Sequence, residues 1–338
     1  MAKRIIAVIG VIALIGALGV GIFYFSLRGD AVAREGDLYI GENTDYDGLL
    51  DSLEAGGFIK SIGRFGTVAA AYGLPEKVRP GRYRISSGAD YISLVKMLGR
   101  GLQTPVRLTF NNIRLLPQLA GRVGAQLEPD SATLAVFLTS DSAARYYGFR
   151  RETFIAMFIP DTYEIYWNVS SEGFADRMKK EYDRFWNEGR EVKRKAMGLS
   201  REEVSTLASI VYEETKMSDE MPTVAGVYVN RLQKGMKLQA DPTVKFAVGD
   251  FTLKRILYRH LDKDSPYNTY MYEGLPPGPI CMPSVVAIDA VLNYKKHDYL
   301  YFCAKPDFSG YHNFASTLAQ HNRNRDAWVA ALNRAGIR

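Results

Sequence analysis

The sequence predicts an α+β protein with an apolar amino-terminal segment, and three observations lead to this prediction. The composition, with 47% hydrophobic and 24% charged residues, is that of a globular protein, so a disordered, collagenous or fibrous chain is excluded. Residues 5–27 contain no charged side chain. From residue 37 onward, short apolar stretches alternate with stretches of helical periodicity, which is typical of α+β modules.

The amino-terminal segment is predicted to anchor the protein in the cytoplasmic membrane. Residues 5–27 are 23 uncharged residues, and as a helix of about 34 Å they would cross a hydrocarbon layer about 30 Å thick. Lys3 and Arg4 precede them, which places the amino terminus in the cytoplasm. A cleaved signal peptide would be shorter and end in small residues, whereas residues 23–25 are aromatic. We therefore expect an uncleaved, single-pass anchor within residues 1–28.

The chain after the anchor divides into four predicted regions. Residues 29–36 form a linker, residues 37–105 a small α+β module, residues 106–150 a helical connecting region, and residues 151–338 a larger α+β domain. Apolar periodicity and turn residues predict the elements before residue 150. The expected strands are 38–40, 82–85 and 106–110, and the expected helices are 45–55, 58–72, 89–98, 115–127 and 131–138.

The charge and the cysteine content narrow the classes of protein. The net charge is +6, and three of the positive charges lie within residues 1–28, so the remainder is too balanced to indicate nucleic-acid binding. Two cysteines, Cys281 and Cys303, cannot form a disulfide-rich scaffold or a four-cysteine zinc site; whether they pair is open. The sequence has no HExxH, P-loop, G-x-G-x-x-G or G-x-S-x-G motif, so we expect no metal ion and no cofactor.

Residues 198–215 are the most informative stretch for catalysis. Ser200 and Glu203 have the spacing of a capping box, which predicts that a helix begins there. Apolar residues follow at helical spacing, and Glu214 continues their stripe as a carboxyl group, while Glu213 points about 100° away. Burial raises the pKa of a carboxyl group, and a raised pKa would keep a proton available for general-acid catalysis near neutral pH. From the pattern alone, a frayed helix end with Glu214 in water is an equally good interpretation.

The segment that follows the next predicted helix has two interpretations. Residues 236–238 alternate apolar and polar side chains, which predicts a short strand. Gln239, Asp241 and Thr243 could then point together into a cleft. In the simpler interpretation, which the pattern favours, residues 241–243 form a turn that caps the next helix.

Three further regions supply polar and aromatic side chains. A helix is predicted over residues 220–234, and residues 265–270 and 274–280 are rich in turn-forming residues. Aromatic rings cover the apolar faces of sugars and amides bond their hydroxyl groups, although a structural loop is an equally valid interpretation. The candidates in these regions and near residue 312 are Asn230, Arg231, Tyr267, Asn268 and His312.

In their order along the chain, these motifs resemble those of the YceG-like (MltG) endolytic murein transglycosylases. The match covers about residues 150–325, and the module at residues 37–105 is similar to the family's LysM-like region. The matching stretches are FIPDTY at 158–163, LASIVYEET at 207–215, VNRL at 229–232, MKLQADPTV at 236–244, YNTY at 267–270, GLPPGPI at 274–280, YF at 301–302 and HNF at 312–314.

The resemblance implies a YceG-like catalytic domain in residues 151–338 that cleaves the β-1,4 bond between MurNAc and GlcNAc in peptidoglycan glycan strands and leaves 1,6-anhydro-MurNAc ends. The family's catalytic glutamate corresponds to Glu214, while Tyr212 replaces another glutamate of the family motif. A bacterial inner-membrane location, with the catalytic part periplasmic or extracytoplasmic, and peptidoglycan synthases as partners are also implied. The residues implied to bind substrate or support Glu214 are Asn230, Arg231, Gln239, Asp241, Thr243, Tyr267, Asn268 and His312.

Two other functions remain open at this point. A hydrolytic muramidase would use Glu214 as acid and Asp241 as base or nucleophile, and would leave reducing ends. A non-catalytic scaffold would bind the cell wall through residues 37–105 and leave the glycan length unaltered. Nucleic acid is not an expected partner in any of these interpretations.

Overall fold

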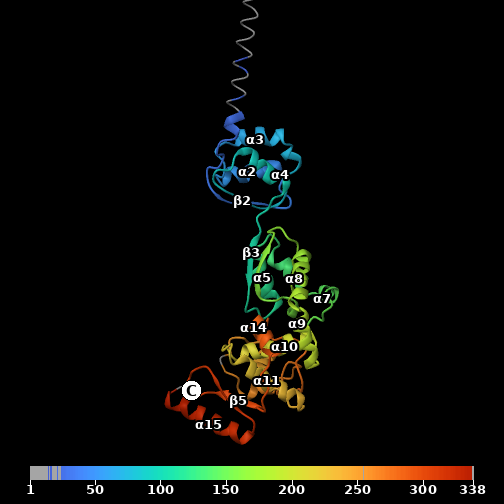
Figure 1. The fold of residues 1–338 in the computed structure, drawn as a ribbon, viewed down its shortest axis with the longest axis vertical. Coiled ribbons are helices and arrows are strands. Elements are labelled where there is room, and N and C mark those ends of the chain that lie inside the picture. The colour runs from blue at the N-terminus through green and yellow to red at the C-terminus, as the bar shows by residue number, and fades with distance from the viewer. Residues whose placement is uncertain (1–13, 15, 17–20, 22–23, 254, 337–338) are drawn as a thin grey trace, which may run out of the picture. The chain divides into compact units, whose positions relative to one another are not determined.

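The computed structural model describes residues 14, 16, 21, 24–253 and 255–336 (Figure 1). The anchor predicted over residues 5–27 therefore falls mostly outside the described residues. Within the described part of the chain, no helix combines the length and the apolar character that crossing a membrane requires. The architecture is a mixed α+β fold, as predicted.

The chain forms two compact units, and each unit draws on more than one stretch of sequence. The first consists of Met1–Leu108, Gln126–Pro129 and Tyr163–Ser170, and the second of Thr109–Ala125, Asp130–Thr162 and Ser171–Arg338. Strands β3 (Val106–Phe110) and β4 (Asp161–Ile165) pair with each other. The division between the units falls within both of these strands.

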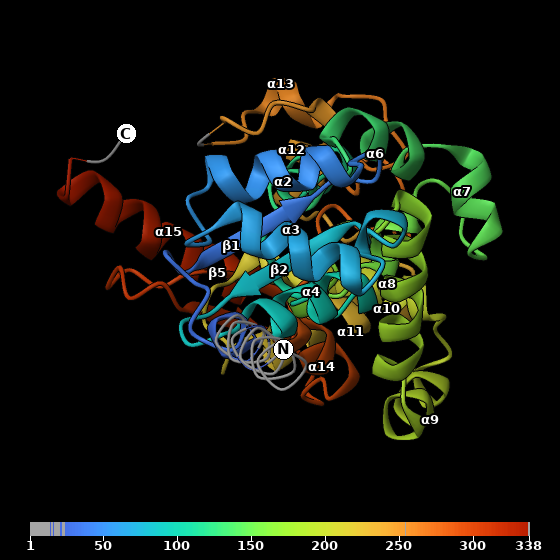
Figure 2. The ribbon, with the colours of Figure 1, turned by 90° about the horizontal axis from the view of Figure 1, so that it is seen from above.

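The first unit contains helices packed on a two-stranded antiparallel sheet, in which Leu38 lies opposite Tyr83. Figure 2 shows the two strands side by side, with the helices next to them. The elements are β1 (Gly36–Ile40), α2 (Tyr46–Ala55), α3 (Ile62–Ala71), η1 (Leu74–Glu76), β2 (Gly81–Ile85) and α4 (Tyr91–Arg100).

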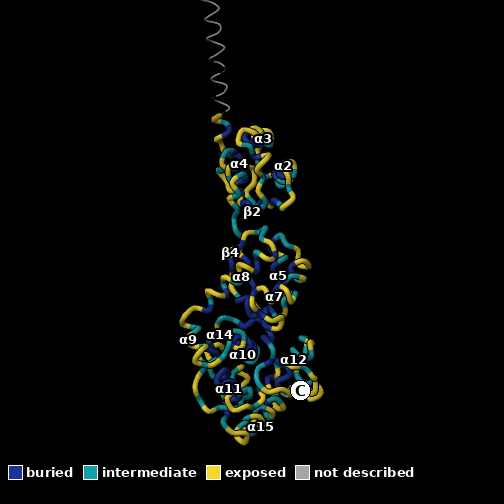
Figure 3. The backbone as a smooth tube through the Cα atoms, turned by 90° about the vertical axis from the view of Figure 1, so that its right-hand side faces the viewer, coloured by how far each residue is buried: buried dark blue, intermediate teal, exposed yellow. Residues whose placement is uncertain are grey.

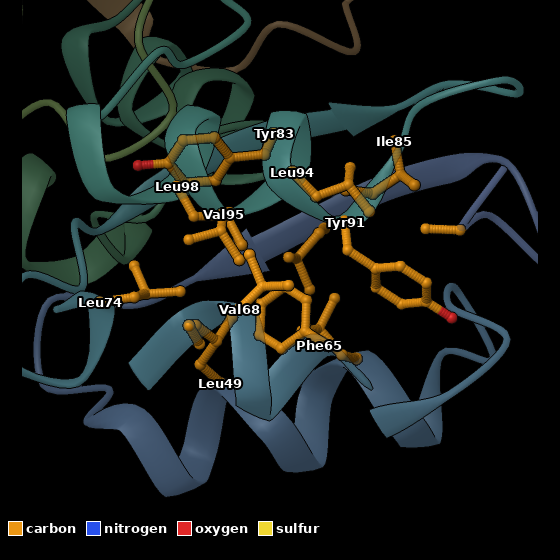
Figure 4. Close-up of a cluster of buried hydrophobic side chains, with 14 of the residues drawn as sticks. Leu49, Phe65, Val68, Leu74, Tyr83, Ile85, Tyr91, Leu94, Val95 and Leu98 are labelled. Atoms are coloured by element: carbon orange, nitrogen blue, oxygen red, sulfur yellow. The ribbon is translucent and has the colours of Figure 1, made fainter. Parts of the chain in front are cut away.

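An apolar core closes this first unit, and helical spacing places its residues. Leu94 and Leu98 of α4, Phe65 of α3 and Leu49 of α2 are each no more than 2% exposed. Figure 4 shows these side chains converging between the helices and the strands. Fully burying an apolar side chain of this size stabilises a fold by about 1.5–3 kcal/mol, so the unit holds together by apolar contact.

Side-chain caps decide where the helices of this unit begin. Asp45 caps α2 and Asp90 caps α4, each by accepting a backbone N–H of the first turn. The helix predicted over residues 58–72 begins later, at Ile62, because the Ser61 hydroxyl caps it there. The residues between 58 and 61 instead connect α2 to α3.

The second unit is mostly helical, with an antiparallel pair of strands in which Phe302 lies opposite Phe314. Its elements are α5 (Leu116–Gly124), α6 (Ser131–Leu138), α7 (Asp141–Tyr146), η2 (Phe154–Met157), α8 (Ser171–Phe185), α9 (Glu188–Met197), α10 (Arg201–Glu214), α11 (Met221–Gln233), α12 (Asp241–Val248), α13 (Tyr258–Leu261), α14 (Val285–Leu292), β5 (Tyr301–Ala304), β6 (His312–Ala315) and α15 (Leu318–Arg334).

Helix α10 carries a long buried run toward the candidate site. Its residues from Val204 to Val211 are all buried, and this helix lies among the dark blue segments of the second unit in Figure 3. The predicted capping box is confirmed, because the Ser200 and Glu203 side chains each accept the other's backbone N–H. The helix start is thereby fixed, and α10 extends from it to Glu214.

The strand predicted over residues 236–238 is wrong. This segment has no regular secondary structure, and it pairs with no strand among the described residues. Gln239 has a φ of 50°, a backbone conformation that residues other than glycine adopt rarely. Helix α12 begins two residues later, at Asp241.

Candidate active site

Glu214 is the last residue of α10, and its half-buried side chain lines a cavity of about 410 Å³. The buried run of α10 fixes the backbone that carries it. The Tyr228 hydroxyl, on the neighbouring helix α11, donates a hydrogen bond of 2.7 Å to Glu214 Oε1. Among the described residues, no hydrogen-bond partner faces Oε2, so this oxygen is available to a substrate.

The surroundings of Glu214 keep its carboxyl group protonated to an unusually high pH. Burial raises the pKa of Glu214 to about 7, and the negative charges of Asp241 and Glu213 also raise it, whereas the hydrogen bond from Tyr228 lowers it. Burial and the nearby Glu214 in turn raise the pKa of Tyr228 far above its usual range. Tyr228 therefore stays protonated as a donor, and Glu214 can hold or release a proton near neutral pH.

Arg231, one turn after Tyr228 on α11, connects the helix to the segment that follows it. The side chain is buried, and its guanidinium donates to the Leu238 carbonyl at 2.6 Å and to Gln239 Oε1 at 3.1 Å. It also lies over the ring of Tyr301 at 5.3 Å. These contacts hold Gln239 at the edge of the cavity, which both residues line.

Asp241 lies at the start of α12 and lines the same cavity as Glu214. The Tyr270 hydroxyl donates to Asp241 Oδ1 at 2.7 Å. Burial and this hydrogen bond raise the pKa of Tyr270 well above its usual range, so the tyrosine keeps its proton. The Asp241 carboxyl group is thereby held in place in the cavity that Glu214 also lines.

The strands β5 and β6 supply an aromatic wall to the cavity. The Phe302 ring packs edge-on against Tyr228, with centroids 5.8 Å apart, and against His312, with centroids 5.2 Å apart. His312 Nδ1 lies 2.7 Å from Glu220 Oε2. The cavity therefore combines aromatic rings with carboxylate, guanidinium and imidazole groups, a set that suits a sugar.

Glu214 and Asp241 also line a second cavity, of about 360 Å³. Glu213, Lys245 and Arg255 contribute to its lining. The reactive carboxyl group therefore has space for a ligand in two cavities rather than at the end of a single pocket.

The predicted residues fall into two groups by location. Glu214, Arg231, Gln239, Asp241 and His312 line the larger cavity. The remaining four do not line it, and their contacts show what they do instead; these four are Asn230, Thr243, Tyr267 and Asn268.

The amides and the hydroxyl of this second group hold loops in place. Asn230 donates to the carbonyls of His297 and Tyr299 at 2.7 and 3.0 Å. The buried Asn268 amide donates to the carbonyls of Leu261 and Lys263, at the end of α13, and the Thr243 hydroxyl donates to the Ala240 carbonyl at 2.7 Å. These groups therefore connect neighbouring segments of the chain, and they do not line the cavity of Glu214.

Tyr267 belongs to a different cavity, lined also by Arg114 and Phe246. Its ring lies 4.7 Å from that of Phe246. The neighbouring turn-rich loop over residues 274–280 is structural as well, because the Ile280 N–H donates to the buried Ser209 hydroxyl of α10 at 3.0 Å. This loop therefore packs against the helix that carries Glu214.

Sequence reasoning missed Tyr228, Tyr270 and Glu220. Tyr228 is 2% exposed and reads as a core residue by its spacing, and only its hydroxyl reveals its role. Tyr270 closes the YNTY stretch, so that motif could have pointed to it. Cys281 and Cys303 are both free thiols, which settles the question of their pairing.

The chain belongs to the YceG-like family, whose pattern matches residues 38–327. A crystal structure of a yceG-like protein from Listeria monocytogenes has the same fold, with a TM-score of 0.55 and 27% identity over 86% of this chain and 99% of that one.

Two curated relatives are similar in sequence, and each is named endolytic murein transglycosylase. The Bacillus subtilis (strain 168) protein is 41% identical over 135 residues, which are 40% of this chain and 37% of that protein. The Streptococcus pneumoniae serotype 2 (strain D39 / NCTC 7466) protein is 29% identical over 322 residues, which are 84% of this chain and 57% of that protein. The chain thus matches about a third to a little over half of the length of these relatives.

Proposed function

We propose that the protein is an endolytic peptidoglycan lytic transglycosylase that cleaves the MurNAc–GlcNAc β-1,4 bond and leaves 1,6-anhydro-MurNAc ends. The observation that carries this proposal is the position of Glu214, a carboxyl group with a pKa of about 7 that lines a cavity together with Asp241, Arg231 and His312. The names of the curated relatives support the reaction type.

The proposed reaction needs one group that first gives and then takes a proton. Protonated Glu214 donates its proton to the glycosidic oxygen as the bond to MurNAc C1 breaks. The MurNAc C6 oxygen then bonds to C1, and the Glu214 carboxylate takes the C6 hydroxyl proton, so the enzyme returns to its starting form. No water is consumed, and the nucleophile is already tethered to the reacting carbon, which favours ring closure.

Cleavage within a strand requires space for sugars on both sides of the bond. Glu214 lines two cavities, of about 410 and about 360 Å³, so sugars could lie on either side of its carboxyl group. This arrangement supports endolytic rather than end-directed cleavage.

Mass spectrometry of glycan strands digested by the purified protein tests this proposal. We expect new 1,6-anhydro-MurNAc ends that arise from cuts within the strand. The Glu214→Gln variant should produce none. Strands that keep their original length and ends would contradict the proposal.

A hydrolytic muramidase is a second candidate because Asp241 lines both cavities with Glu214. In that reaction Asp241 would activate water or attack the sugar directly, as in two-carboxylate glycosidases. Reducing MurNAc ends in the same mass spectrum, with incorporation of ¹⁸O from labelled water, would favour this candidate.

We also propose that residues 5–27 anchor the protein in the bacterial inner membrane with the catalytic part outside the cytoplasm. The uncharged length of this segment and the preceding Lys3 and Arg4 support the proposal. Protease added to spheroplasts should digest the catalytic part. The same protease added to intact cells should leave the protein uncut.

Two further proposals concern the first unit and the partners. Residues 37–105 would act as a LysM-like module that holds glycan, supported by the small α+β fold of β1, β2 and α2–α4. Peptidoglycan synthases would be partners, because a cut in a nascent strand sets where its synthesis ends. Binding of an isolated synthase to the full-length protein would test the proposal about partners.

A further inference from the structure

Glu220 and His312 form a closely bonded pair at the edge of the cavity that contains Glu214. Glu220 directly precedes α11 and is 6% exposed, and His312 is the first residue of β6. Glu220 Oε2 lies 2.7 Å from His312 Nδ1, and Oε1 accepts the His312 backbone N–H at 2.8 Å. The Thr215 hydroxyl also donates to Oε2, at 3.2 Å.

These contacts determine that His312 Nδ1 is one of the ring nitrogens that carry a proton. A carboxylate only accepts hydrogen bonds, so His312 Nδ1 must carry a proton in order to bond Glu220. The second ring nitrogen, Nε2, of a neutral imidazole then has a lone pair. Because His312 lines the cavity, Nε2 is the ring nitrogen available to a ligand there.

The same carboxylate also fixes the end of α10. Thr215 directly follows Glu214, and its hydroxyl accepts the Met217 N–H at 3.1 Å while donating to Glu220. Glu220 therefore contacts both the residue next to the proposed acid and the histidine on the facing strand. One buried group thus sets the position of two cavity-lining side chains relative to each other.

We propose that Glu220 is a positioning residue that holds His312 with its proton on Nδ1, so that His312 Nε2 accepts a hydrogen bond from a hydroxyl group of the bound glycan. This inference rests on the proposed function, since it takes the glycan strand as the ligand of the cavity. It adds a second ligand contact, on the β6 side, to the one that Glu214 makes.

The competing explanation is that the pair is only a structural contact that connects β6 to the start of α11. Two substitutions at His312 distinguish the two explanations. Asn keeps a donor near the position of Nδ1, so it can still bond Glu220, but it has no atom at the position of Nε2. Gln reaches the position of Nε2 but cannot donate to Glu220 as the imidazole does. The two variants therefore each preserve one of the two contacts.

The experiment measures binding of soluble GlcNAc–MurNAc oligosaccharides by titration calorimetry, in the full-length protein carrying Glu214→Gln so that no cleavage occurs. We expect His312→Asn to weaken affinity about five- to tenfold, as the loss of one hydrogen bond to a ligand does, with an unfolding temperature close to that of the parent. We expect His312→Gln to bind more tightly than His312→Asn although it unfolds at a lower temperature.

Glu220→Gln provides the matching test of the positioning residue. Its amide has one donor end, which must face either the His312 backbone N–H or both the Thr215 hydroxyl and His312 Nδ1, so the imidazole is no longer held in one form. We expect a loss of affinity that adding His312→Asn does not increase further. If His312→Asn weakens the affinity of the Glu220→Gln protein by the same factor as it weakens that of the parent, the two residues are not coupled. That result would overturn the positioning role of Glu220.

If His312→Asn binds as tightly as the parent and only His312→Gln loses affinity, the proposal is overturned. The pair is then a structural contact between β6 and the start of α11. The outcome is separate from that of the proposed function. If the wild-type protein binds the oligosaccharide but yields no anhydro ends, the proposed reaction fails while the comparison at His312 still decides this inference. A parent that binds no oligosaccharide would overturn both.

Discussion

The apolar core of the first unit and the cavity of the second unit differ in what they bury. Leu49 and Phe65 in the core are fully buried, and removing such side chains from water stabilises the fold. In the cavity, the polar groups of Glu214, Tyr228 and Arg231 are removed from water, which costs stability unless they are paired. The comparison indicates that the first region was shaped by packing and the second by chemistry.

The largest effect is expected for Glu214→Gln, which keeps the shape of the side chain and removes the acid. Loss of a general acid lowers rates by about 10²–10⁴-fold, so anhydro-ended products should fall below detection while the circular dichroism spectrum is unchanged. Liquid chromatography of the digested glycan measures this. Full activity in the variant would remove Glu214 from the mechanism.

The neighbouring carboxyl group provides the matched control for that variant. Glu213 pairs with Arg114 at 2.7 Å, and its side chain is 14% exposed. We expect Glu213→Gln to destabilise the protein, because Arg114 loses its partner, but to keep activity within about tenfold of the wild type. Equal losses in both variants would mean that the two carboxyl groups act as one unit.

In the apolar core, the expected effect is on stability and not on chemistry. Phe65→Ala should lower the free energy of unfolding of the first unit by about 3–5 kcal/mol, because Phe65 is fully buried. Leu50→Ala, at a partly buried position beside the same core, should cost less. Denaturant unfolding measures both, and cleavage of soluble glycan per folded molecule should stay unchanged, whereas a loss of cleavage would show that the core also supports the chemistry.

The carboxyl group of Glu214 should also affect the stability of the fold, with the opposite sign. The pKa of Glu214 is raised from 4.5 to about 7 in the folded protein, so the stability linked to its protonation is fully present below pH 4.5 and is lost as the pH rises through 7. Glu214→Gln removes this loss. As the pH rises from 4.5 to 7, the free energy of unfolding of the variant should therefore increase relative to that of the wild type, by at most about 3 kcal/mol. Thermal unfolding across that range measures the difference; parallel curves for the two proteins would indicate that Glu214 titrates normally.

Asp241→Asn should shift the pH dependence of catalysis. The charge of Asp241 raises the pKa of Glu214, so its removal lowers that pKa and moves the alkaline limb of kcat/KM to lower pH. At pH 8 we expect an additional loss of about two- to fivefold relative to pH 6. A uniform loss of more than about 10³-fold at every pH would instead favour the hydrolytic candidate, in which Asp241 takes part in bond breaking.

Much of the fold could be predicted because its signals are local. The capping box at Ser200 and the apolar stripe of α10 lie within one helix, and the core helices of the first unit follow the same rule. The strand over residues 236–238 failed because the contact that shapes this segment is not local: Arg231 holds the Leu238 carbonyl at 2.6 Å. No short pattern encodes such a contact.

The site was only partly predictable for a related reason. Glu214 stood out because a carboxyl group on an apolar stripe breaks the pattern, whereas Tyr228 fits the pattern of a core residue. Polar residue types alone did not separate ligand contacts from loop supports, since Asn268 is fully buried and bonded to backbone. Which polar groups face the cavity depends on the packing of distant segments.

The smallest expected effect, from Tyr228→Phe, compares the two regions directly. The variant removes the hydrogen bond that lowers the pKa of Glu214, so the alkaline limb of kcat/KM should move to higher pH, opposite to the shift in Asp241→Asn. Tyr83→Phe in the first unit is the matched control, because it also removes one hydroxyl hydrogen bond, to the Arg79 carbonyl at 2.8 Å. Both variants should lose about 0.5–1.5 kcal/mol of stability, but only Tyr228→Phe should shift the limb. If the alkaline limb of kcat/KM does not shift in Tyr228→Phe, the Tyr228 hydroxyl contributes only to stability, as that of Tyr83 does. The difference between the two regions would then not extend to this residue.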